Sequence, residues 1–518
     1  ATGYTKYAGD LSLPNMAYLC MLHSKIPHGY VKAVHAEKAL ALPGVYGVYH
    51  CLNTSERKYN RYRSSFDQAY LANEECAFND YVRFVGDKIG AVAACDQETA
   101  EKAARLVEVE YEELPFSIGF DDTLAGKNCL DGETPVRDEY ELDVGEKQGS
   151  AEGLIEVCST MELPRLHHAT METHACIADY DPYSDMLTVY CPNQAVHGIR
   201  TVLADFLEMP ESHVRVVKAT MGGSFGAKQE WFLEPVTALV AKKLCRPVKL
   251  VYSRGEAMTD TIVRGAMRMS ARGYYTPDGE MKEIYCDVTL DAGAYIGNAG
   301  DYVRALAGKP TRCYRIPYMH YHGQVISSNS PVSGAFRSWS AAEEALMMER
   351  QLDAAAEKIG MDRLVIRLKN VARSGEEDKK LHLSLEDIRI GDAITLGSEK
   401  FGWDKLKAED AAFNASQQRY RRGVGIGIGG HGNTYFPRFN DYGEGSISLN
   451  ADGSMQANFT LHDHGCGTVT AMRMIAAEVL KVPEDKIYMT EGDTAVTPID
   501  YGCFASRTTY VVGRAVQD

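Results

Sequence analysis

The chain has 518 residues, of which 45% are hydrophobic and 24% charged. These proportions are typical of a globular protein with more than one domain and exclude a disordered, collagen-like or miniature disulfide-bonded chain. The formal net charge is −16, whereas proteins that bind nucleic acids usually have a basic surface. A chain this acidic is also not attracted to anionic membranes. No apolar run reaches the roughly 18 residues of a spanning helix, and no secretory signal opens the sequence. We therefore predict neither a nucleic acid nor a membrane as partner.

The thirteen cysteines are scattered, and the closest pair, Cys176 and Cys191, is fifteen positions apart. No Cys-x-x-Cys pair occurs, although iron–sulfur clusters and structural zinc sites normally use one. The chain itself is therefore expected to carry neither. An odd, scattered set of cysteines also argues against a disulfide framework and for a reducing compartment, so we predict a cytoplasmic location.

The first part of the chain predicts mixed α and β structure. Val82–Cys95 is typical of a β-rich segment interrupted by a Gly-Asp turn. Gln97–Val109 predicts an amphipathic helix, because its small apolar residues recur at helical spacing. The polar, turn-rich segment Phe120–Gly132 indicates a first domain boundary.

The middle of the chain continues this alternation. Glu234–Cys245 predicts a helix with Pro235 at its favourable first turn, and Val248–Tyr252 predicts a strand. Ala341–Ile359 predicts a long helix that Gly360 terminates.

The last part begins with the charge-dense stretch Arg373–Lys380, which indicates a linker between lobes. Ser446–Leu449 and Met455–Leu461 flank the Asp-Gly turn of Asn450–Ser454 and predict a hairpin. Val469–Leu480 predicts a further helix.

Three familiar motifs are matched only in part. The stretch GVGIGIGG at 423–430 contains Gly-x-Gly-x-x-Gly but lacks the flanking strand and helix of a dinucleotide site, so we expect a closely packed glycine-rich strand. The stretch MGGSFGAKQE at 221–230 has no Ser or Thr after its lysine and does not predict a phosphate-binding loop. The stretch HDHGC at 462–466 offers metal ligands on one strand face, but no fourth partner is near in sequence.

Four glycine-rich or polar loops remain, and they are far apart in the sequence. They are CPNQ (Cys191–Gln194), MGGSFGAKQE (Met221–Glu230), SGAFRSWS (Ser333–Ser340) and CFASRTT (Cys503–Thr509). Glycines let backbone N–H groups approach a ligand closely, and these loops add neutral and cationic donors. Such loops suit an anionic ligand that is rich in hydrogen-bond acceptors.

In this order, the loops resemble those of the molybdenum hydroxylases of the xanthine dehydrogenase and aldehyde oxidase type. GGSFGAK resembles the family's GGxFGxK, SGAFRSW resembles its AFRGFG, and HATME at 168–172 resembles its His-x-x-Met-Glu. ATGYTKYAGD at 1–10 and Val82–Pro115 resemble the opening and close of its N-terminal domain. These ordered matches over the chain identify it as a member of this family.

The resemblance implies an α+β fold in three parts. Residues 1–130 are expected to form an α/β hammerhead domain. A two-lobed molybdopterin-binding domain is expected to follow, with its first lobe at 131–375 and its second, incomplete lobe at 376–518.

The resemblance also implies a molybdopterin-type molybdenum cofactor. Gln194 is expected at the apical oxo ligand, Phe225 and Gly226 over the metal, Arg337 at the pterin and Ala505 on the metal's other side, with none of them a direct ligand. Further expected cofactor contacts are Gly223, Gly465, Cys466, Ser506 and Arg507. The nucleotide form of the pterin, with the cytosine dinucleotide as one option, stays open, as does the choice of a sulfido or selenido ligand.

One departure from the family concerns the cofactor's phosphate. The family commonly has Gly-Gln-Gly where this chain has Gly465-Cys466-Gly467. The phosphate contact of that glutamine is therefore open, with His464 or the backbone as candidates to replace it.

The expected substrate pocket favours a flat, electron-poor ring. Arg304 aligns with the arginine that xanthine-type enzymes use on the purine, and Gln229 stands where they have a glutamate. Trp339 occupies the family's stacking aromatic position. Ser338 replaces the copper-binding cysteine of the carbon monoxide branch. We therefore expect water-derived oxygen to be inserted into an aromatic N-heterocycle, with a purine-like one favoured.

The resemblance assigns no catalytic residue to this chain. The family's general base is a glutamate in a further C-terminal segment, and it is expected here on a second molybdopterin-binding chain. Electrons are expected to leave through partner subunits that carry iron–sulfur centres and FAD.

Two alternatives are open. The chain could belong to an aldehyde oxidoreductase of the same family. It could also be a non-catalytic subunit that scaffolds or assembles the cofactor, since Cys466 and Ser338 depart from the family's pattern.

Overall fold

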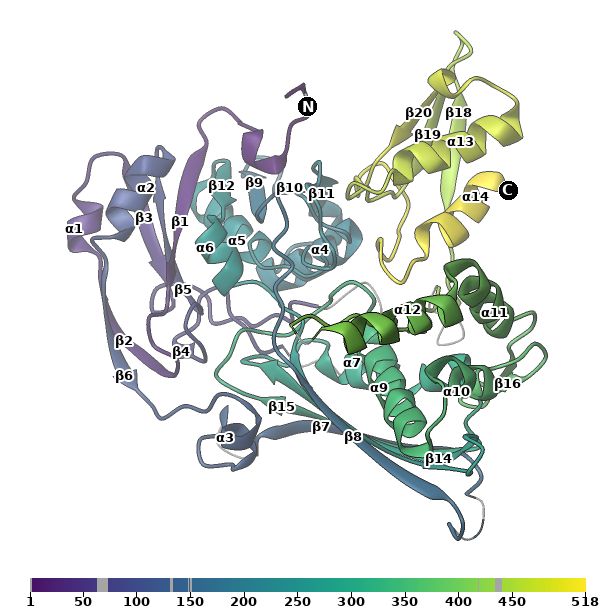
Figure 1. Ribbon diagram of the computed structural model, residues 1–518. Coiled ribbons are helices and arrows are strands. Elements are labelled where there is room, and N and C mark those ends of the chain that lie inside the picture. Colours follow the sequence, from purple (N-terminus) through teal and green to yellow (C-terminus); the bar gives the residue numbers. More distant parts are fainter. Residues whose placement is uncertain are drawn as a thin grey trace.

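Figure 1 shows the computed structural model, which describes residues 2–62, 73–130, 134–147, 149, 151–417, 419–433 and 440–518. Its helices and strands are mixed throughout, as the predicted α+β class requires. Three large buried apolar clusters form separate cores in the described part of the chain. The first lies in the N-terminal half, the second under the long helix α9 (Ala341–Ile359), and the third in the C-terminal lobe.

A seven-stranded sheet joins the N-terminal region to the first lobe, in the order β11-β10-β9-β12-β1-β5-β3. Its strands are β1 (Ala17–His23), β3 (Val45–His50), β5 (Lys88–Ala94), β9 (Ala175–Asp181), β10 (Met186–Cys191), β11 (Val214–Lys218) and β12 (Val248–Val251). Because β1 pairs in parallel with β12, the hammerhead region and the first lobe share one sheet and one hydrophobic core.

Helices and a second small sheet surround this sheet. The helices are α1 (Glu37–Leu40), α2 (Gln97–Ala104), α4 (Val196–Leu207), α5 (Glu234–Leu244) and α6 (Arg254–Thr259), and short 3₁₀ turns lie at Ala8–Asp10 and Glu211–His213. Helix α2 packs on β1 and β5, and α5 packs on β9. The small sheet has the order β4-β2-β6 and consists of β2 (Gly29–His35), β4 (Tyr81–Val82) and β6 (Glu108–Glu113).

A five-stranded sheet forms the lower part of the molecule in Figure 1, in the order β7-β15-β14-β13-β8. Its strands are β7 (Val136–Gly145), β8 (Ile155–Leu163), β13 (Ala266–Tyr275), β14 (Met281–Gly293) and β15 (Tyr318–Ser327). The helices of this part are α3 (Phe120–Leu124), α7 (Ala299–Ala307), α8 (Pro310–Cys313), α9 and α10 (Arg363–Asn370). Helices α7 and α9 pack against the sheet and bury its apolar face.

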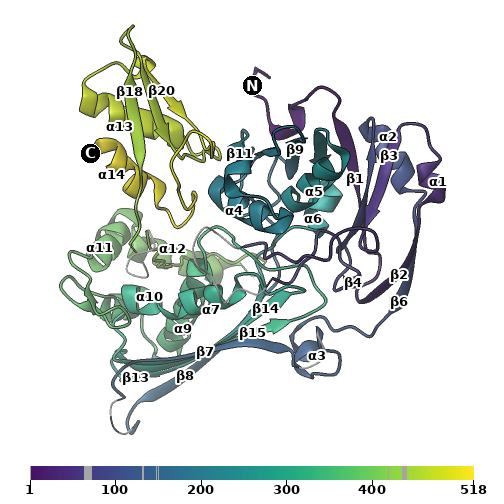
Figure 2. The ribbon, with the colours of Figure 1, turned by 180° about the vertical axis from the view of Figure 1, so that it is seen from behind.

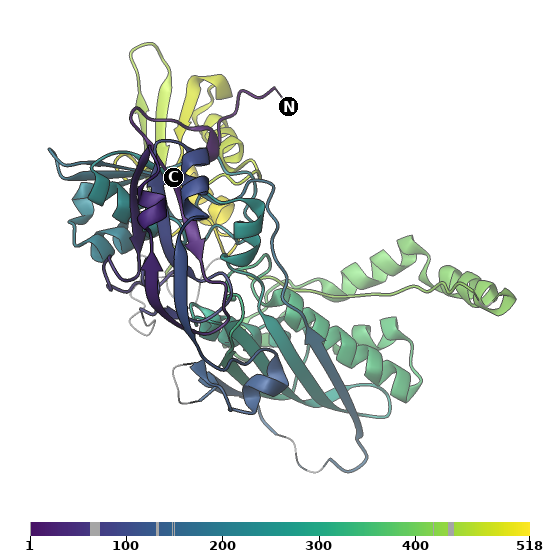
Figure 3. The same cartoon turned by 90° about the vertical axis from the view of Figure 1, so that its left-hand side faces the viewer.

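The last part of the chain crosses an extended arm before it reaches the C-terminal lobe. The arm carries β16 (Glu377–Asp378), β17 (Leu383–Ser384), α11 (Ile390–Phe401) and α12 (Trp403–Ser416), and the two helices project away from the body in Figure 3. The lobe contains β18 (Gly445–Leu449), β19 (Met455–Phe459), β20 (Ile487–Thr490), α13 (Thr468–Leu480), the 3₁₀ turn Glu484–Lys486, the π-helical turn η5 (Thr508–Val512) and α14 (Gly513–Gln517). Figure 2 shows this lobe facing the first lobe across the top of the molecule.

Most predicted elements are confirmed, and the exceptions have physical reasons. The helix predicted over Gln97–Val109 ends at Ala104, because the alternating sequence EVEYEE at 108–113 forms the strand β6. The glycine-rich strand predicted at 423–430 is wrong: the segment has no regular structure, although Ile426 and Ile428 pack on the second core. The predicted linker Arg373–Lys380 is anchored to the body, since Asp378 is buried against Arg312.

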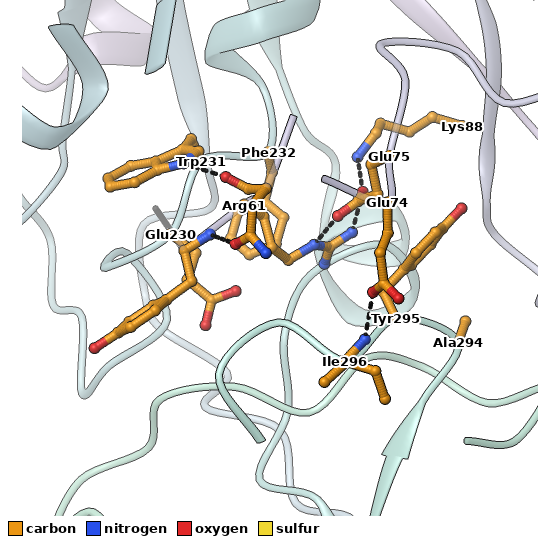
Figure 4. Close-up of polar contacts among 12 residues, drawn as sticks. Arg61, Glu74, Glu75, Lys88, Glu230, Trp231, Phe232, Ala294, Tyr295 and Ile296 are labelled. Carbon is orange, nitrogen blue, oxygen red and sulfur yellow. Dashed lines mark hydrogen bonds and ion pairs between the residues drawn. The ribbon is translucent and has the colours of Figure 1, made fainter. Parts of the chain in front are cut away.

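A buried network of charges fastens the hammerhead region to the first lobe. Glu75 forms a bidentate ion pair with Arg61, and it lies 3.4 Å from the amine of Lys88 (Figure 4). Lys88 in turn lies 3.9 Å from Asp260 of the first lobe. All four side chains are almost fully buried. The Arg61 guanidinium also lies over the ring of Phe232, 4.9 Å from its centroid.

We predict that Glu75→Ala lowers the free energy of unfolding by about 3–5 kcal/mol, because it leaves two buried cations without their shared carboxylate. Urea denaturation followed by tryptophan fluorescence measures this change. The matched control is Glu98→Ala, which removes an exposed ion pair with Lys102 and is expected to cost less than about 0.5 kcal/mol. Equal effects of the two substitutions would contradict the prediction.

Candidate functional site

The sheet topology brings the first two loops together. Loop Cys191–Gln194 follows β10, and loop Met221–Glu230 comes soon after β11. These strands are parallel neighbours, with Cys191 opposite Lys218. Parallel strands end at the same edge of a sheet, so the two loops emerge side by side.

The side chain of Gln194 connects three of the four loops. Its Oε1 accepts a hydrogen bond from Ser224 Oγ, and its Nε2 donates to the carbonyl oxygen of Cys503. The Cys503 N–H donates back to the Gln194 carbonyl oxygen at 2.9 Å, and the Gln194 N–H donates to Lys228 at 2.8 Å. The side chain is buried, so residues 191–194, 221–230 and 503–509 are held at one point.

The fourth loop is attached through Gly226. The Arg337 N–H donates to the Phe225 carbonyl oxygen at 2.8 Å. A Cβ at position 226 would lie 2.5 Å from the Ala335 carbonyl oxygen, and Gly226 has φ +108°. Only glycine fits this approach and this conformation. Phe225 also has a positive φ of 56°.

His168 and Glu172 of the HATME segment, together with the nearby His174, form hydrogen bonds or ion pairs with the two glycine-rich loops. His168 Nε2 lies 2.8 Å from the Ala335 carbonyl oxygen, and His174 Nε2 lies 3.0 Å from that of Ala227. Burial lowers the pKa of His168 to about 4 and that of His174 to about 3, so both rings are neutral and donate from Nε2. Glu172 pairs with Lys228 at 2.6 Å and accepts from the Gly222 N–H at 2.7 Å.

Arg507 holds the CFASRTT loop in place from inside the lobe. Its side chain is fully buried and forms ion pairs with Asp441 at 2.8 Å and Asp500 at 2.7 Å. It also donates to the carbonyl oxygens of Gly502 and Tyr442. Its donors are therefore used within the protein, and it positions the loop rather than facing a ligand.

Where the four loops meet, several backbone N–H groups have no acceptor within the described protein. Ala505 and Ser506 have φ values of 51° and 50°. Within the described residues, the N–H groups of Phe225, Gly226, Ala505 and Ser506 donate to no protein group. Unpaired N–H groups at a junction of strained loops suit an anionic, acceptor-rich group. The residues present therefore fit a molybdenum–pterin cofactor.

Trp339 lies at the boundary between two cores. Its ring is stacked on Tyr62 at 6.3 Å and tilted against Tyr302 at 5.0 Å, and it packs on both the first and the second core. Ser338, Trp339 and Ser340 have successive positive φ values of 78°, 37° and 62°. Such strain persists only where the surroundings impose it.

The strained turn is held by a lysine that the sequence analysis did not single out. Lys309 donates to the Trp339 carbonyl oxygen and, at 2.9 Å, to Ser340 Oγ. Burial lowers the pKa of Lys309 to about 8. The sequence around Lys309 carries no signal for this contact, because 30 residues separate it from Trp339.

Arg304 lies on α7 and is paired with a carboxylate. Its guanidinium forms a bidentate pair with Asp138, at 2.5 and 2.8 Å, and lies over the ring of Tyr140. These partners belong to β7 of the five-stranded sheet. Arg337 and Gln229, by contrast, lie at the junction: Arg337 is exposed and Gln229 is half-buried.

The second lobe contributes the turn Gly465-Cys466-Gly467 before α13. His462 ties this turn to the first lobe, because the Val196 N–H donates to its Nε2 at 3.3 Å. Cys503 Sγ lies 3.7 Å from His464 Nδ1. The described residues contain no cluster of three or more His, Cys, Asp or Glu side chains that could hold a metal ion, and no helix among them is long and apolar enough to span a membrane.

Comparisons with known proteins cover almost all of the chain. Residues 2–115 match the aldehyde oxidase and xanthine dehydrogenase a/b hammerhead domain, and residues 136–371 and 396–518 match molybdopterin cofactor-binding domains. The chain is 30% identical over 541 residues to the xanthine dehydrogenase molybdenum-binding subunit of Escherichia coli O157:H7, covering 100% of this chain and 69% of that one.

Two further similar proteins have names that give other activities. The chain is 30% identical over 377 residues to the nicotinate dehydrogenase large molybdopterin subunit of Eubacterium barkeri, covering 72% of this chain and 86% of that one. It superposes on the aldehyde oxidoreductase of Desulfovibrio gigas with a TM-score of 0.86 and 26% identity, covering 100% of this chain and 57% of that one.

We predict that His168 makes stability depend on pH. The pKa of His168 falls from 6.5 to about 4 in the folded state. Below about pH 6.5 the unfolded chain takes up a proton that the folded chain does not. The stability from the neutral ring is therefore full above pH 6.5 and is lost as the pH falls towards 4, by on the order of 3 kcal/mol.

Unfolding measured at pH 7 and pH 4.5 tests this prediction. His168→Gln keeps a donor for Ala335 but does not titrate, so its loss of stability between the two pH values should be smaller than that of the parent protein. His382→Gln, at an exposed histidine, is the control and should behave as the parent does. Parallel pH profiles for the parent and His168→Gln would refute the prediction.

Proposed function

The chain belongs to the molybdenum hydroxylase family of the xanthine dehydrogenase and aldehyde oxidase type, and it is an oxidoreductase subunit. On this premise we propose that it holds the molybdenum cofactor of an enzyme that inserts water-derived oxygen into an electron-poor carbon of an aromatic N-heterocycle. The observation that carries this proposal is the junction at Gln194, where loops that are up to 309 residues apart meet.

A bound molybdenum cofactor would supply Lewis acidity and the transferable oxygen. The protein would supply hydrogen-bond donors that hold the cofactor. Gln194 has a second Nε2 hydrogen for an oxo group, and the free N–H groups of Phe225, Gly226, Ala505 and Ser506 would donate to the metal–pterin region. Gly223 and exposed Arg337 would contact the pterin side. Arg507 would keep the CFASRTT loop in its positive-φ conformation.

The substrate preference rests on Trp339 and Gln229. A flat ring suits the aromatic group formed by Trp339, Tyr62 and Tyr302, in which Trp339 is half-buried. Gln229 both donates and accepts hydrogen bonds, so it can bind ring nitrogens in either protonation state. We leave Arg304 out of the pocket, since a substrate would have to compete with its bidentate contact to Asp138. An aldehyde oxidoreductase is the alternative, and the Desulfovibrio gigas likeness favours it.

We also propose that the enzyme works as a complex. Two carboxylates beside the loops are poorly suited to act as the base: Glu172 pairs with Lys228, and Glu230 is fully buried, with a pKa raised by burial to about 8 that keeps it protonated at neutral pH. The general base is therefore assigned to a second molybdopterin-binding chain. Partner subunits with iron–sulfur centres and FAD would take the electrons.

The thirteen cysteines are all free, which supports a reducing, cytoplasmic setting. The cytosine dinucleotide form and a sulfido or selenido ligand belong to the same proposal.

The cofactor assignment predicts the effect of Gln194→Ala in the purified complex. Turnover should fall at least 100-fold, the usual effect of removing one such donor, and molybdenum and pterin content should fall with it, because the loops lose their shared hydrogen bonds. Metal analysis and pterin fluorescence measure the content. Gln97→Ala on the hammerhead helix is the control and should retain both. A complex without molybdenum or pterin would instead favour the non-catalytic scaffold.

The substrate assignment predicts that hypoxanthine or nicotinate is turned over in preference to benzaldehyde. Trp339→Ala should raise the KM for the heterocycle about 5- to 10-fold, as the loss of one stacking contact of about 1 kcal/mol or more implies. Trp339→Phe keeps an aromatic ring and should restore most of the binding. Turnover of benzaldehyde alone would replace this assignment with the aldehyde alternative.

A further inference from the structure

The turn formed by Ser338, Trp339 and Ser340 has an unfavourable backbone conformation. All three residues have positive φ values, of 78°, 37° and 62°, in a region that residues other than glycine seldom adopt. Such a conformation persists only where neighbouring groups impose it. The contacts made to this turn therefore decide where the Trp339 ring lies.

Lys309 supplies two of these contacts. It lies between α7 and α8, and its amine donates to the Trp339 carbonyl oxygen and, at 2.9 Å, to Ser340 Oγ. Ser340 is the N-cap residue of α9, but its hydroxyl forms no cap hydrogen bond with that helix. A serine at this position usually accepts from its own helix. Here the hydroxyl is an acceptor for Lys309, so one amine holds both the turn and the start of α9.

Arg264 holds the loop just before the turn. It donates to the Arg337 carbonyl oxygen at 2.7 Å, and its guanidinium lies over the ring of Phe336, 4.3 Å from the centroid. One cation therefore fixes the residues before the turn, and Lys309 fixes the turn itself. Loss of the Lys309 amine is expected to release Trp339 while the preceding residues stay in place.

Lys309 differs from the other buried lysines in its partners. Lys88, Lys218 and Lys228 are also buried, and each forms an ion pair with a glutamate. Among the described residues, Lys309 forms no ion pair, and its hydrogen bonds go to the turn. Burying an amine without a paired carboxylate is costly. The contact is therefore not a stabilising ion pair, and its effect is to order the turn.

The ring of Trp339 is held by the same part of the chain as its backbone. Tyr302, on the helix that precedes Lys309, is tilted against the ring, with 5.0 Å between the centroids. Tyr62 is stacked on the ring at 6.3 Å, with 17° between the planes. Helices α7 and α9, on either side of the contact, pack against each other (Figure 1). A shift of the turn would move the half-buried ring relative to both tyrosines.

We propose that Lys309 is a positioning residue for substrate binding, which fixes the Trp339 ring in the orientation in which a flat heterocycle stacks on it. This proposal rests on the proposed function, because that function makes Trp339 the stacking residue. Lys309 acts through the turn and need not touch the substrate. A stacking wall stabilises the bound substrate and the transition state alike, so a misplaced ring raises KM and leaves kcat almost unchanged.

Kinetics of the purified complex test this proposal with Lys309→Met, which keeps an unbranched side chain and removes its donors. The KM for hypoxanthine or nicotinate should rise about 3- to 5-fold, less than on loss of the whole ring, with kcat within about 2-fold. Lys309→Arg keeps donors for both acceptors and should restore most of the affinity. Lys358→Met is the matched control, since exposed Lys358 on α9 also donates to a backbone carbonyl, that of Glu156 at 2.6 Å. It should leave KM unchanged.

A double-mutant cycle determines whether Lys309 acts through Trp339. In a Trp339→Ala background, Lys309→Met should raise KM no further, because the ring that it positions is already absent. A general structural role would instead raise KM by the same factor in both backgrounds.

Acrylamide quenching of tryptophan fluorescence reports on Trp339 without substrate or molybdenum. The chain has three tryptophans, so the signal of Trp339 is the difference between each protein and its Trp339→Phe counterpart. Lys309→Met should make Trp339 more accessible to the quencher, and Lys358→Met should not. If Lys309→Met does not fold, Ser340→Ala replaces it, because it removes one acceptor of the same amine and should change KM and quenching in the same direction.

The proposal is overturned if Lys309→Met leaves KM and the quenching of Trp339 unchanged, or if it raises KM equally with and without the Trp339 ring. Heterocycle turnover with a KM that is indifferent to Lys309 would overturn this proposal and leave the proposed function standing. Altered quenching in a complex that turns over benzaldehyde alone would support the link between Lys309 and Trp339 while refuting the proposed substrate.

Discussion

The side-chain amide of Gln194 is the contact on which the site depends. The loops around it have little regular structure, so their backbone N–H and carbonyl groups must find partners outside a helix or sheet. One buried amide accepts from Ser224 and donates to Cys503, while the backbone of the same residue bonds to both loops. Because each loop satisfies the other's polar groups, no loop can adopt this conformation alone.

The supporting residues are buried or nearly so and use polar atoms to hold the loops, although His168 Nδ1, His174 Nδ1 and Glu172 Oε1 have no partner among the described residues. His168 and His174 donate from neutral rings, Glu172 and Lys228 neutralise each other, and Arg507 is enclosed by two carboxylates. Such groups are costly to bury and become stabilising only when every partner is present. Their arrangement frees the backbone donors at the loop tips, which carry no partner of their own and are therefore open to a ligand.

Buried, paired polar groups also connect the hammerhead region to the first lobe. A shared sheet, with β1 beside β12, and the buried contact of Lys88 with Asp260 make the two parts one unit. The Gln194 loop leaves this sheet at its edge. Trp339 packs on this core and on that of the five-stranded sheet, so the strained turn that carries it is fixed from both sides.

The sequence by itself determined the class of fold, most helices and strands, and the loops that form the site. Periodicity is local, which is why the long helix Ala341–Ile359 could be predicted residue by residue. The resemblance of four loops named the family and the residues at the junction. It did not reveal Lys309, Ser224 or the contact of His464 with Cys503, because those pairs lie 30 or more residues apart along the chain.

Only the tertiary structure decided which of the expected residues meet. It brought Gln194, Ser224 and Cys503 to one point, whereas it engaged Arg304 with Asp138 and enclosed Arg507 in carboxylates. A sequence motif specifies which donors are present. Whether a guanidinium is free to bind a ligand depends on which carboxylate the fold places beside it, and strand pairing between distant segments sets that.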